Sequence, residues 1–384
     1  MLGINTNINS LVAQQNLNGS QSALSQAITR LSSGSKINSA ADDAAGLAIA
    51  TRMQTQINGL NQGVQNTNSA VSLIQTASSQ LSALTTSLQR ISTLATEAAN
   101  GTLSQSDQVA AQQEVADQIA EVNRIASQTN FNGKNLLDGS AGIVTFQVGA
   151  NVGQTVTLDL SQSLSAAKIG GGLVQSGQTV GTIQGLSLDA NGAATTAAQP
   201  AITSVNVLSD GKGGFTFTDQ NGQALSSTAV GAIFTNGTAA GTGTAVTNLT
   251  LATGATSGMT AAQASAATQM VTQINAVNAP PTVSNLSISS ATGANQTIFS
   301  VANALATINN LQATLGATQN RLQAVAQTQQ ANSTNLSSAQ SQIQSADFAQ
   351  ETANLSRAQV LQQAGISVLA QANSLPQQVL KLLQ

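Results

Sequence analysis

The sequence contains no cysteine, no histidine, no tryptophan and no tyrosine among its 384 residues. Without thiols and imidazoles the chain cannot form disulfides, use a cysteine nucleophile or a histidine base, or build the common zinc sites. Large classes of enzyme are thereby excluded, and we predict no enzymatic activity, no metal site and no cofactor. The adjacent carboxylates Asp42 and Asp43 have no base or metal ligand beside them in the sequence. We therefore expect them to cap or cross-link helices rather than act as a catalytic pair.

Charge is also scarce. Charged residues make up 7% of the chain, whereas about 25% is usual in globular domains. The net charge of -3 comes from 11 basic and 14 acidic residues that are scattered singly, so no basic patch is available for nucleic acid or an anionic membrane. A soluble monomer normally keeps lysine and glutamate on its surface. The shortage therefore predicts that other copies of the chain cover much of that surface.

Long apolar runs are missing as well. The segment Met1–Ile8 has neither the basic region nor the apolar core of a secretory signal peptide. No run approaches the ~20 apolar residues that a membrane-spanning helix requires. If the protein leaves the cell, we expect export by a system that recognises a signal other than a secretory signal peptide.

Both ends of the chain have helical periodicity, over residues 5–130 and 297–384. Apolar residues recur there at alternating spacings of three and four, which is typical of the narrow seam of a coiled coil. The positions outside the seam are mostly Gln, Asn, Ser, Thr and Ala, which permit close packing against neighbouring helices. The clearest apolar series consist of Val71, Ile74, Leu81, Leu88 and Ala95, then Val115, Ile119, Val122 and Ala126, and finally Ile308, Leu311, Leu315, Leu322, Val325, Leu336, Ala339, Ile343 and Ala346.

The middle of the chain has the period of two that is typical of strands. Two alternating runs, 144–148 and 156–160, predict a β-hairpin, and alternation returns at 205–207 and 215–217. Asn221-Gly222 predicts a type I′ turn. A short helix is expected around Met270, Ile274 and Val277, ending before Pro280-Pro281. Residues 166–296 thus form a mostly β insert, and because its ends must lie close together, the terminal helices run back alongside each other.

Several long stretches resemble the bacterial flagellins. At the N-terminal end the resemblance lies in Leu31–Gly34 and Lys36–Ala50. At the C-terminal end it lies in Ala346–Ala349, Leu361–Gly365 and Val368–Asn373, followed by Pro376 and Val379-Leu380. The matching ends span roughly the first 160 and the last 85 residues. The resemblance implies a structural subunit of the extracellular flagellar filament that serves swimming motility.

The resemblance also implies an architecture. The fold class expected is mainly α with a β-rich central insert: an antiparallel coiled-coil rod from both chain ends, a β-hairpin and a variable, mostly β domain. Residues 1–42 with 343–384 are expected to form the inner core, 43–165 with 297–342 the helical rod and hairpin, and 166–296 an outward-facing domain. Export unfolded through the flagellar type III apparatus is implied. The implied partners are other subunits, an export chaperone, the filament cap protein and the hook-filament junction protein.

The chain ends carry thin apolar stripes that bury too little surface alone to offset the entropy of ordering, so we expect them to fold on assembly. A contact that repeats head to tail without closing produces an open helix. The candidate assembly residues are Ile4, Ile8, Leu11, Leu24, Ile28, Leu31, Asp42 and Asp43 near one end, and Leu361, Gln362, Gln363, Leu369, Asn373, Pro376, Val379, Leu380 and Leu383 near the other.

A second site follows from the resemblance alone. Arg90, Leu94 and Glu114 match the flagellin positions that the flagellin-sensing Toll-like receptor of animal innate immunity recognises. The same side chains also suit contact with a neighbouring subunit in the filament. Both roles remain open, because a filament buries what its monomer exposes.

Three alternative functions compete with a plain filament subunit. A flagellin with a metallopeptidase in its insert is excluded, because zinc binding there requires two histidines on a helix. The hook-filament junction protein shares the N-terminal pattern, but it should lack the signature from Leu361 to Leu383. A filament subunit with an adhesive role would use a face within residues 166–296.

Overall fold

The computed structural model describes residues 7–196, 199–235 and 248–382. The chain divides into two compact units. The first comprises Met1–Asn68, Gln147–Thr155 and Ala324–Gln384, and the second comprises Ser69–Phe146 and Val156–Gln323. Within the described ranges no helix is both long and apolar enough to cross a membrane.

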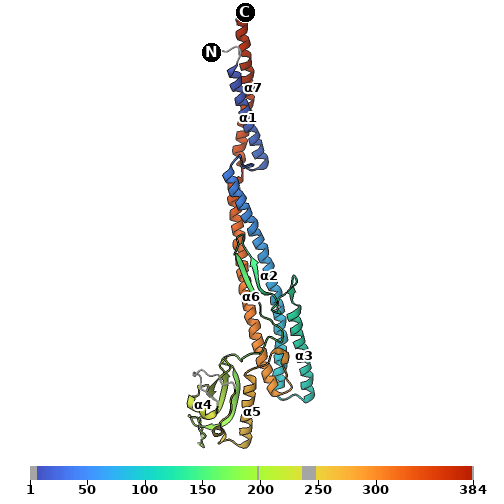
Figure 1. The fold of residues 1–384 in the computed structure, drawn as a ribbon, viewed down its shortest axis with the longest axis vertical. Coiled ribbons are helices and arrows are strands. Elements are labelled where there is room, and N and C mark those ends of the chain that lie inside the picture. Colours follow the sequence, from blue (N-terminus) through green and yellow to red (C-terminus); the bar gives the residue numbers. More distant parts are fainter. Residues whose placement is uncertain (1–6, 197–198, 236–247, 383–384) are drawn as a thin grey trace. The chain divides into compact units, whose positions relative to one another are not determined.

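Long helices dominate both ends of the chain, and short strands fill the middle (Figure 1). The helices are α1 (Ile8–Ser33), α2 (Ala44–Ala99), α3 (Gln105–Gln128), α4 (Ser227–Ile233), α5 (Ala261–Val277), α6 (Ala291–Gln344) and α7 (Phe348–Leu382), with short 3-10 turns η1 (Thr253–Thr256) and η2 (Val283–Asn285). The strands are β1 (Asn130–Phe131), β2 (Lys134–Asn135), β3 (Gly142–Gln147), β4 (Thr155–Leu160), β5 (Thr179–Leu188), β6 (Ile202–Ser209) and β7 (Phe215–Asp219).

In the first unit α1 lies antiparallel to α7. Near one end of the pair, the Asn7 side chain donates a hydrogen bond to the Ala372 carbonyl at 2.7 Å. Near the other end, the Lys36 backbone nitrogen donates to the Gln344 carbonyl at 2.7 Å. The two termini of the chain therefore run back along each other, as the position of the insert predicted.

The start of α2 pairs with the end of α6 in the same unit. The Ser333 hydroxyl donates to the Asn61 side chain at 2.9 Å, and the Gln340 amide donates to the Ala50 carbonyl at 3.2 Å. These contacts are neutral hydrogen bonds, consistent with the shortage of charge along the helices.

The tip between β3 and β4 lies directly on α2. A Cβ atom at Gly63 would lie 2.4 Å from the Val148 carbonyl oxygen, and one at Gly59 would lie 2.7 Å from the Ala150 Cβ. The Asn66 side chain donates to the Gln147 carbonyl at 2.9 Å. Two glycines one helical turn apart thus let the backbone of the tip approach the backbone of the helix.

In the second unit α2 buries a broader surface than the predicted seam. Besides the predicted Ile74, Leu81, Leu88 and Ala95, side chains between them are buried too. The narrow-seam interpretation of α2 was therefore wrong, because this helix packs against more than one neighbour. The additional buried residues of α2 include Leu73, Ala77, Leu84, Ile91 and Leu94, while in α3 and α6 the buried residues include Val115, Val122, Ile125, Ile308, Leu315 and Leu322.

The predicted hairpin is present as the two-stranded sheet β3-β4. A smaller hairpin, β1-β2, precedes it, with Phe131 paired to Lys134. Its two-residue turn places Asn132 at φ 51° and Gly133 at φ 78°, the positive values that a type I′ turn requires at both central positions.

The insert has its own core around the antiparallel sheet β5-β6-β7. Helix α5 confirms the short helix expected around Met270, Ile274 and Val277. It lies against this sheet through Ile274 and Val277, and Phe217 stacks on Phe234 with ring centroids 4.9 Å apart. The short helix α4 was not predicted. It is anchored by Val230 and Ile233, both buried.

The predicted type I′ turn at Asn221-Gly222 was wrong. Only Gly222 of that pair has positive φ, 76°. The Asp219 carboxylate instead accepts hydrogen bonds from the backbone nitrogens of Asn221 and Gln223, each at 2.8 Å. This side chain satisfies two turn donors at once and so stabilises a wider turn.

The fold class is as predicted: mainly helical, with terminal helices, a β-hairpin and a β-rich insert. The insert's core, from Val174 to Val277, lies inside the predicted 166–296 segment. The inner-core and rod boundaries of 1–42 with 343–384 and 43–165 with 297–342 stay a prediction.

We predict that Gly63→Ala lowers the free energy of unfolding by about 1–3 kcal/mol, because the added methyl group meets backbone atoms that cannot rotate away. Thermal unfolding of the monomer measures the change. The matched control is Gly316→Ala on α6, where nothing lies within 4 Å of the new Cβ atom. This control should be neutral or up to about 1 kcal/mol stabilising, and equal effects of the two variants would contradict the packing account.

Candidate functional site

The contact between α1 and α7 is made by small side chains. The buried residues of the pair include Ala13 and Ala27 on α1 and Ala358 and Ala372 on α7, each at most 6% exposed. In each helix the two alanines are fourteen positions apart, which is two heptads. A Cβ atom at Gly365 would lie 3.3 Å from a Leu17 methyl carbon. The helices thus pair closely without burying their large apolar residues.

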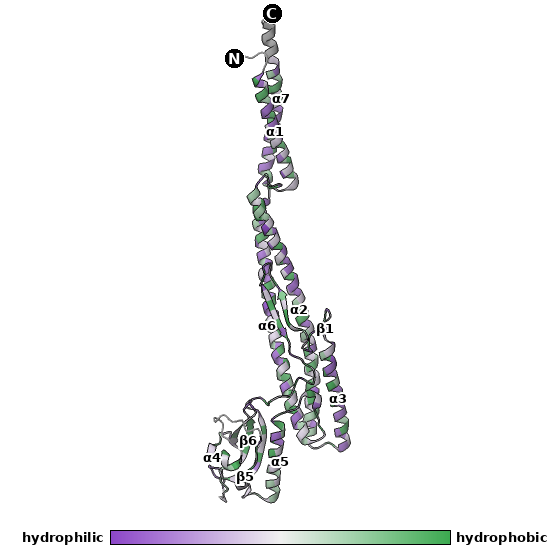
Figure 2. Cartoon of the chain, in the orientation of Figure 1, coloured by the Kyte–Doolittle hydropathy of each residue, from purple (hydrophilic) through white to green (hydrophobic). Residues whose placement is uncertain are grey.

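The large apolar residues of these helices largely face outward. Ile8 is 64% exposed, Leu11 69%, Ile28 51% and Leu361 52%, and green and purple residues are mixed along both helices (Figure 2). Leu24, Leu31, Gln362 and Leu369 are partly buried, whereas Gln363 and Asn373 are exposed. Further exposed apolar residues, which the sequence did not single out, are Val12, Phe348, Val360, Ile366 and Val368.

Some of the predicted assembly residues cannot be placed. Ile4 and Leu383 lie outside the described residues, and Pro376, Val379 and Leu380 lie in a part of α7 whose side chains are not described. The alanines at the α1-α7 contact, in turn, were not predicted. Their spacing of two heptads is the sequence signal that could have identified them.

Asp42 and Asp43 organise the connection between α1 and α2. The Asp43 carboxylate accepts a hydrogen bond from the Gly46 nitrogen at 2.8 Å and so caps the start of α2. The Asp42 carboxylate accepts from the Gln26 amide at 3.1 Å and from the Ser39 nitrogen at 2.9 Å. These hydrogen bonds, led by that from Gln26, hold the pKa of Asp42 below its ordinary value. The two carboxylates cap and cross-link helices, as expected from the sequence.

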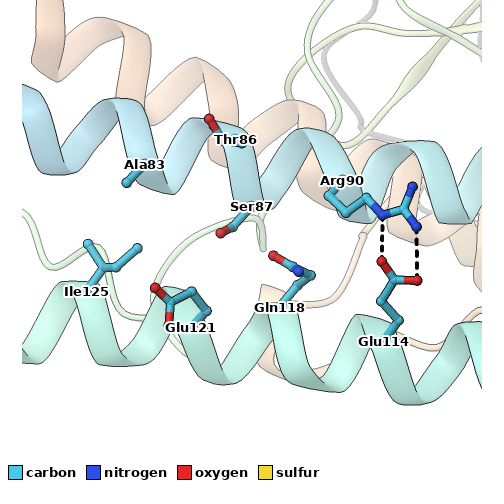
Figure 3. A pocket seen from close by; sticks show the side chains of 8 residues that line it. All are labelled: Ala83, Thr86, Ser87, Arg90, Glu114, Gln118, Glu121 and Ile125. Atoms are coloured by element: carbon cyan, nitrogen blue, oxygen red, sulfur yellow. Dashed lines mark hydrogen bonds and ion pairs between the residues drawn. The ribbon is translucent and has the colours of Figure 1, made fainter.

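A hollow of about 550 Å³ lies between α2 and α3 (Figure 3). Arg90 projects from α2 toward Glu114 on α3, and the pair forms two parallel hydrogen bonds, Nε to Oε1 at 2.6 Å and Nη2 to Oε2 at 3.0 Å. The sequence did not single out the other residues around this hollow. They are Ala83, Thr86, Ser87, Gln118, Glu121 and Ile125.

The bidentate pair shifts both of its titrating groups. The hydrogen bonds from Arg90 hold the pKa of Glu114 below its ordinary value, and those same bonds raise the pKa of Arg90. Both side chains stay close to half exposed, at 49% and 39%, so solvent screens the attraction and the pair contributes little to stability. The pair joins two helices, α2 and α3, whereas the other bidentate pair among the described residues, Arg124 with Glu121, lies within α3.

Leu94 does not share this surface. Its side chain is 4% exposed, so it packs in the core of the second unit and cannot offer itself to a partner in this conformation. The role of Leu94 in recognition beside Arg90 and Glu114 stays a prediction, but its side chain is buried whereas theirs are partly exposed. The physical reason is the broad burial of α2, which includes this face.

We predict that Arg90→Ala raises the pKa of Glu114 toward its ordinary value of 4.5, because the variant removes the hydrogen bonds that favour the carboxylate. A carboxyl group with a depressed pKa stabilises the fold above its unfolded pKa and loses that contribution as pH falls through the folded pKa. NMR titration of the Glu114 carboxyl measures the shift. Arg124→Ala is the control, since it should move only Glu121, its own partner, and an unchanged Glu114 in Arg90→Ala would disprove the assignment.

The sequence matches three family models. These are the bacterial flagellin N-terminal helical region over residues 4–142, the flagellin D2 domain over residues 172–277, and the bacterial flagellin C-terminal helical region over residues 298–383. Together they cover both helical ends and the insert, and the D2 match contains all of the insert's buried core from Val174 to Val277.

Full-length relatives agree with the family models. The chain is 35% identical to the B-type flagellin of Pseudomonas aeruginosa, with both chains covered in full, and 35% identical to flagellin E of Vibrio cholerae, with 99% of both chains covered. Among solved structures, FliC from Burkholderia pseudomallei is 63% identical, with a TM-score of 0.60, over 66% of this chain and 99% of the other. These matches do not favour a junction protein or an adhesin. The chain therefore belongs to the bacterial flagellins, and it is a subunit of the flagellar filament.

Proposed function

We propose that the chain polymerises through the outward faces of α1 and α7. The observation that carries this proposal is the exposure of large apolar residues on two helices that already pair through alanines. Such residues gain free energy by leaving water, and the alanine contact leaves them available to other subunits. The predicted assembly residues Ile8, Leu11, Ile28 and Leu361 belong to this set. Placing these helices in the filament also places the protein outside the cell, on the flagellum.

The same features suit export before assembly. We infer that the chain passes unfolded through the flagellar type III apparatus, since it has no disulfides to hold it folded. Val360, Leu361 and Ile366 expose an apolar face on α7, which suits an export chaperone that covers the C-terminal segment until assembly. The filament cap protein and the hook-filament junction protein complete the proposed partners.

We infer that the chain has a structural role without catalysis. The flagellins are structural proteins, and the three carboxylates singled out from the sequence are engaged in structural contacts. Asp43 caps α2, Asp42 binds Gln26, and Glu114 pairs with Arg90. Polar groups occupied in this way are not available to activate a nucleophile or a water.

For the monomer we propose recognition by the Toll-like flagellin receptor at the hollow between α2 and α3. Arg90 and Glu114 offer exposed charges on a chain that has few, and they lie at the positions that the family resemblance assigned to recognition. Leu94 supports the site from the core. In the filament the same surface suits contact with a neighbouring subunit.

We predict that Leu11→Gln raises the critical concentration for polymerisation about tenfold or more, since an apolar side chain no longer leaves water on assembly. Sedimentation and electron microscopy of filaments grown at a series of protein concentrations measure it. Gln15→Ala, an exposed polar change on the same helix, serves as the control and should polymerise normally. If Leu11→Gln polymerises like the control, this face of α1 does not drive assembly.

A chain without residues 1–42 and 343–384 should remain monomeric at concentrations that polymerise the full chain. Electron microscopy with filament seeds tests this, and circular dichroism should show that residues 43–342 keep their fold. If the shortened chain forms filaments, elements within residues 43–342 must make the assembly contact.

The double variant Arg90→Ala with Glu114→Ala should lose most of the receptor response of the monomer in reporter cells that express the flagellin receptor. Arg321→Ala, an exposed arginine on α6, is the matched control and should keep full potency. If the double variant keeps full potency, the recognition proposal is wrong, whereas the filament role is unaffected.

A further inference from the structure

The sequence contains seven Asn-Gly pairs, a dipeptide in which the asparagine amide is open to attack by the next backbone nitrogen. Glycine has no Cβ to obstruct that attack. The structure describes six of these pairs and holds them in different environments, whereas Asn236-Gly237 lies outside the described residues. The six are Asn18-Gly19, Asn58-Gly59, Asn100-Gly101, Asn132-Gly133, Asn191-Gly192 and Asn221-Gly222.

Most of these pairs are protected by their backbone hydrogen bonds. The pairs at 18 and 58 lie inside α1 and α2, where the glycine nitrogen donates to the carbonyl four residues earlier. In the turns of the insert, the Gly192 nitrogen donates to the Asp189 carbonyl at 3.0 Å and the Gly222 nitrogen to the Asp219 carbonyl at 3.1 Å. A nitrogen that donates a hydrogen bond must lose it before it can be deprotonated and attack.

The pair Asn132-Gly133 lacks this protection. Both residues are exposed, nothing lies within 4 Å of a Cβ atom built at Gly133, and the Gly133 nitrogen has no hydrogen-bond acceptor among the residues that the structure describes. The Asn132 side chain likewise has no hydrogen-bond partner in that part of the chain. At Asn100-Gly101 the corresponding bond, Gly101 nitrogen to Ala98 carbonyl, is long at 3.5 Å, so this pair is intermediate.

We propose that Asn132 is a site of spontaneous deamidation and isoaspartate formation. The Gly133 nitrogen gives its proton to solvent and attacks Cγ of Asn132. The new N–Cγ bond replaces the Cγ–Nδ2 bond, and the amide nitrogen takes a proton from water and leaves as ammonia. Water then opens the cyclic imide at either carbonyl carbon, breaking one C–N bond to give aspartate or isoaspartate.

The modification changes the hairpin in which it occurs. Asn132 is the non-glycine residue with positive φ in the described chain, a conformation that asparagine tolerates better than most residues. Isoaspartate adds a methylene to the backbone inside a two-residue turn, so the type I′ geometry is lost. The turn lies just before the buried Leu136 and Leu137. Each event also adds a negative charge to a surface with few charges.

The test is peptide mapping by mass spectrometry of the full-length monomer, aged in buffer at mildly alkaline pH. Trypsin releases the segment 125–134, because it cleaves after Arg124 and after Lys134. Asn221-Gly222 is the internal control: the same dipeptide in an exposed turn, but with its glycine nitrogen bonded. In the folded chain we expect Asn132 to convert about tenfold faster than Asn221, the factor that an ordinary net hydrogen bond provides.

Three further measurements assign the cause. In denaturant both turns unfold, so the two rates should converge. Asp219→Ala removes the carboxylate that stabilises the turn at Asn221-Gly222. It should therefore accelerate deamidation at Asn221 and leave the rate at Asn132 unchanged. Asn132→Gln should abolish labelling of segment 125–134 by an isoaspartyl methyltransferase. Equal rates at Asn132 and Asn221 in the folded chain, or a faster rate at Asn221, would overturn the proposal.

Discussion

Close approach between backbones is the constraint on which the rest of the structure depends. Where α1 meets α7 the buried apolar residues are alanines, and where the β3-β4 tip meets α2 two glycines of the helix admit the backbone of the tip. Small residues let dispersion contacts and neutral hydrogen bonds hold long elements together. Because these contacts do not consume the large apolar side chains, Ile8 and Leu11 remain on the surface. A subunit built in this way leaves part of its apolar surface for its neighbours.

Scarcity of charge has a related consequence. A protein with few ionic groups relies on amides and hydroxyls at its helix contacts, as in the bonds from Ser333 to Asn61 and from Gln340 to Ala50. The bidentate pair of Arg90 and Glu114 is an ionic contact between two helices, although solvent limits its energetic value. The two surfaces that we propose for assembly and recognition thus differ in kind: exposed apolar residues on α1 and α7, and charged residues between α2 and α3.

The two Asn-Gly turns show how much of a turn's conformation the dipeptide itself determines. Asn221-Gly222 predicted a type I′ turn, yet the turn of that class lies at Asn132-Gly133. The dipeptide permits positive φ at both positions but does not impose it. The decisive group is Asp219, whose carboxylate binds two backbone nitrogens and stabilises the wider turn. Both turns are exposed, and they also differ at the glycine nitrogen, which donates to the Asp219 carbonyl in the second turn and has no acceptor among the described residues in the first.

The sequence by itself determined the class of this protein. Helical periodicity at both ends, alternation in the middle, the lack of charge and the flagellin stretches predicted the fold class, the pairing of the termini and the filament role. The roles of Asp42 and Asp43 in capping and cross-linking were also predictable from the sequence, because these roles depend on residues close in the chain. Tertiary structure alone decided which residues of each apolar stripe are buried. Periodicity gives the direction of a side chain but not the number of partners around its helix, so it did not reveal that alanines rather than Leu11 or Ile28 pair α1 with α7, or that Leu94 is enclosed in the core.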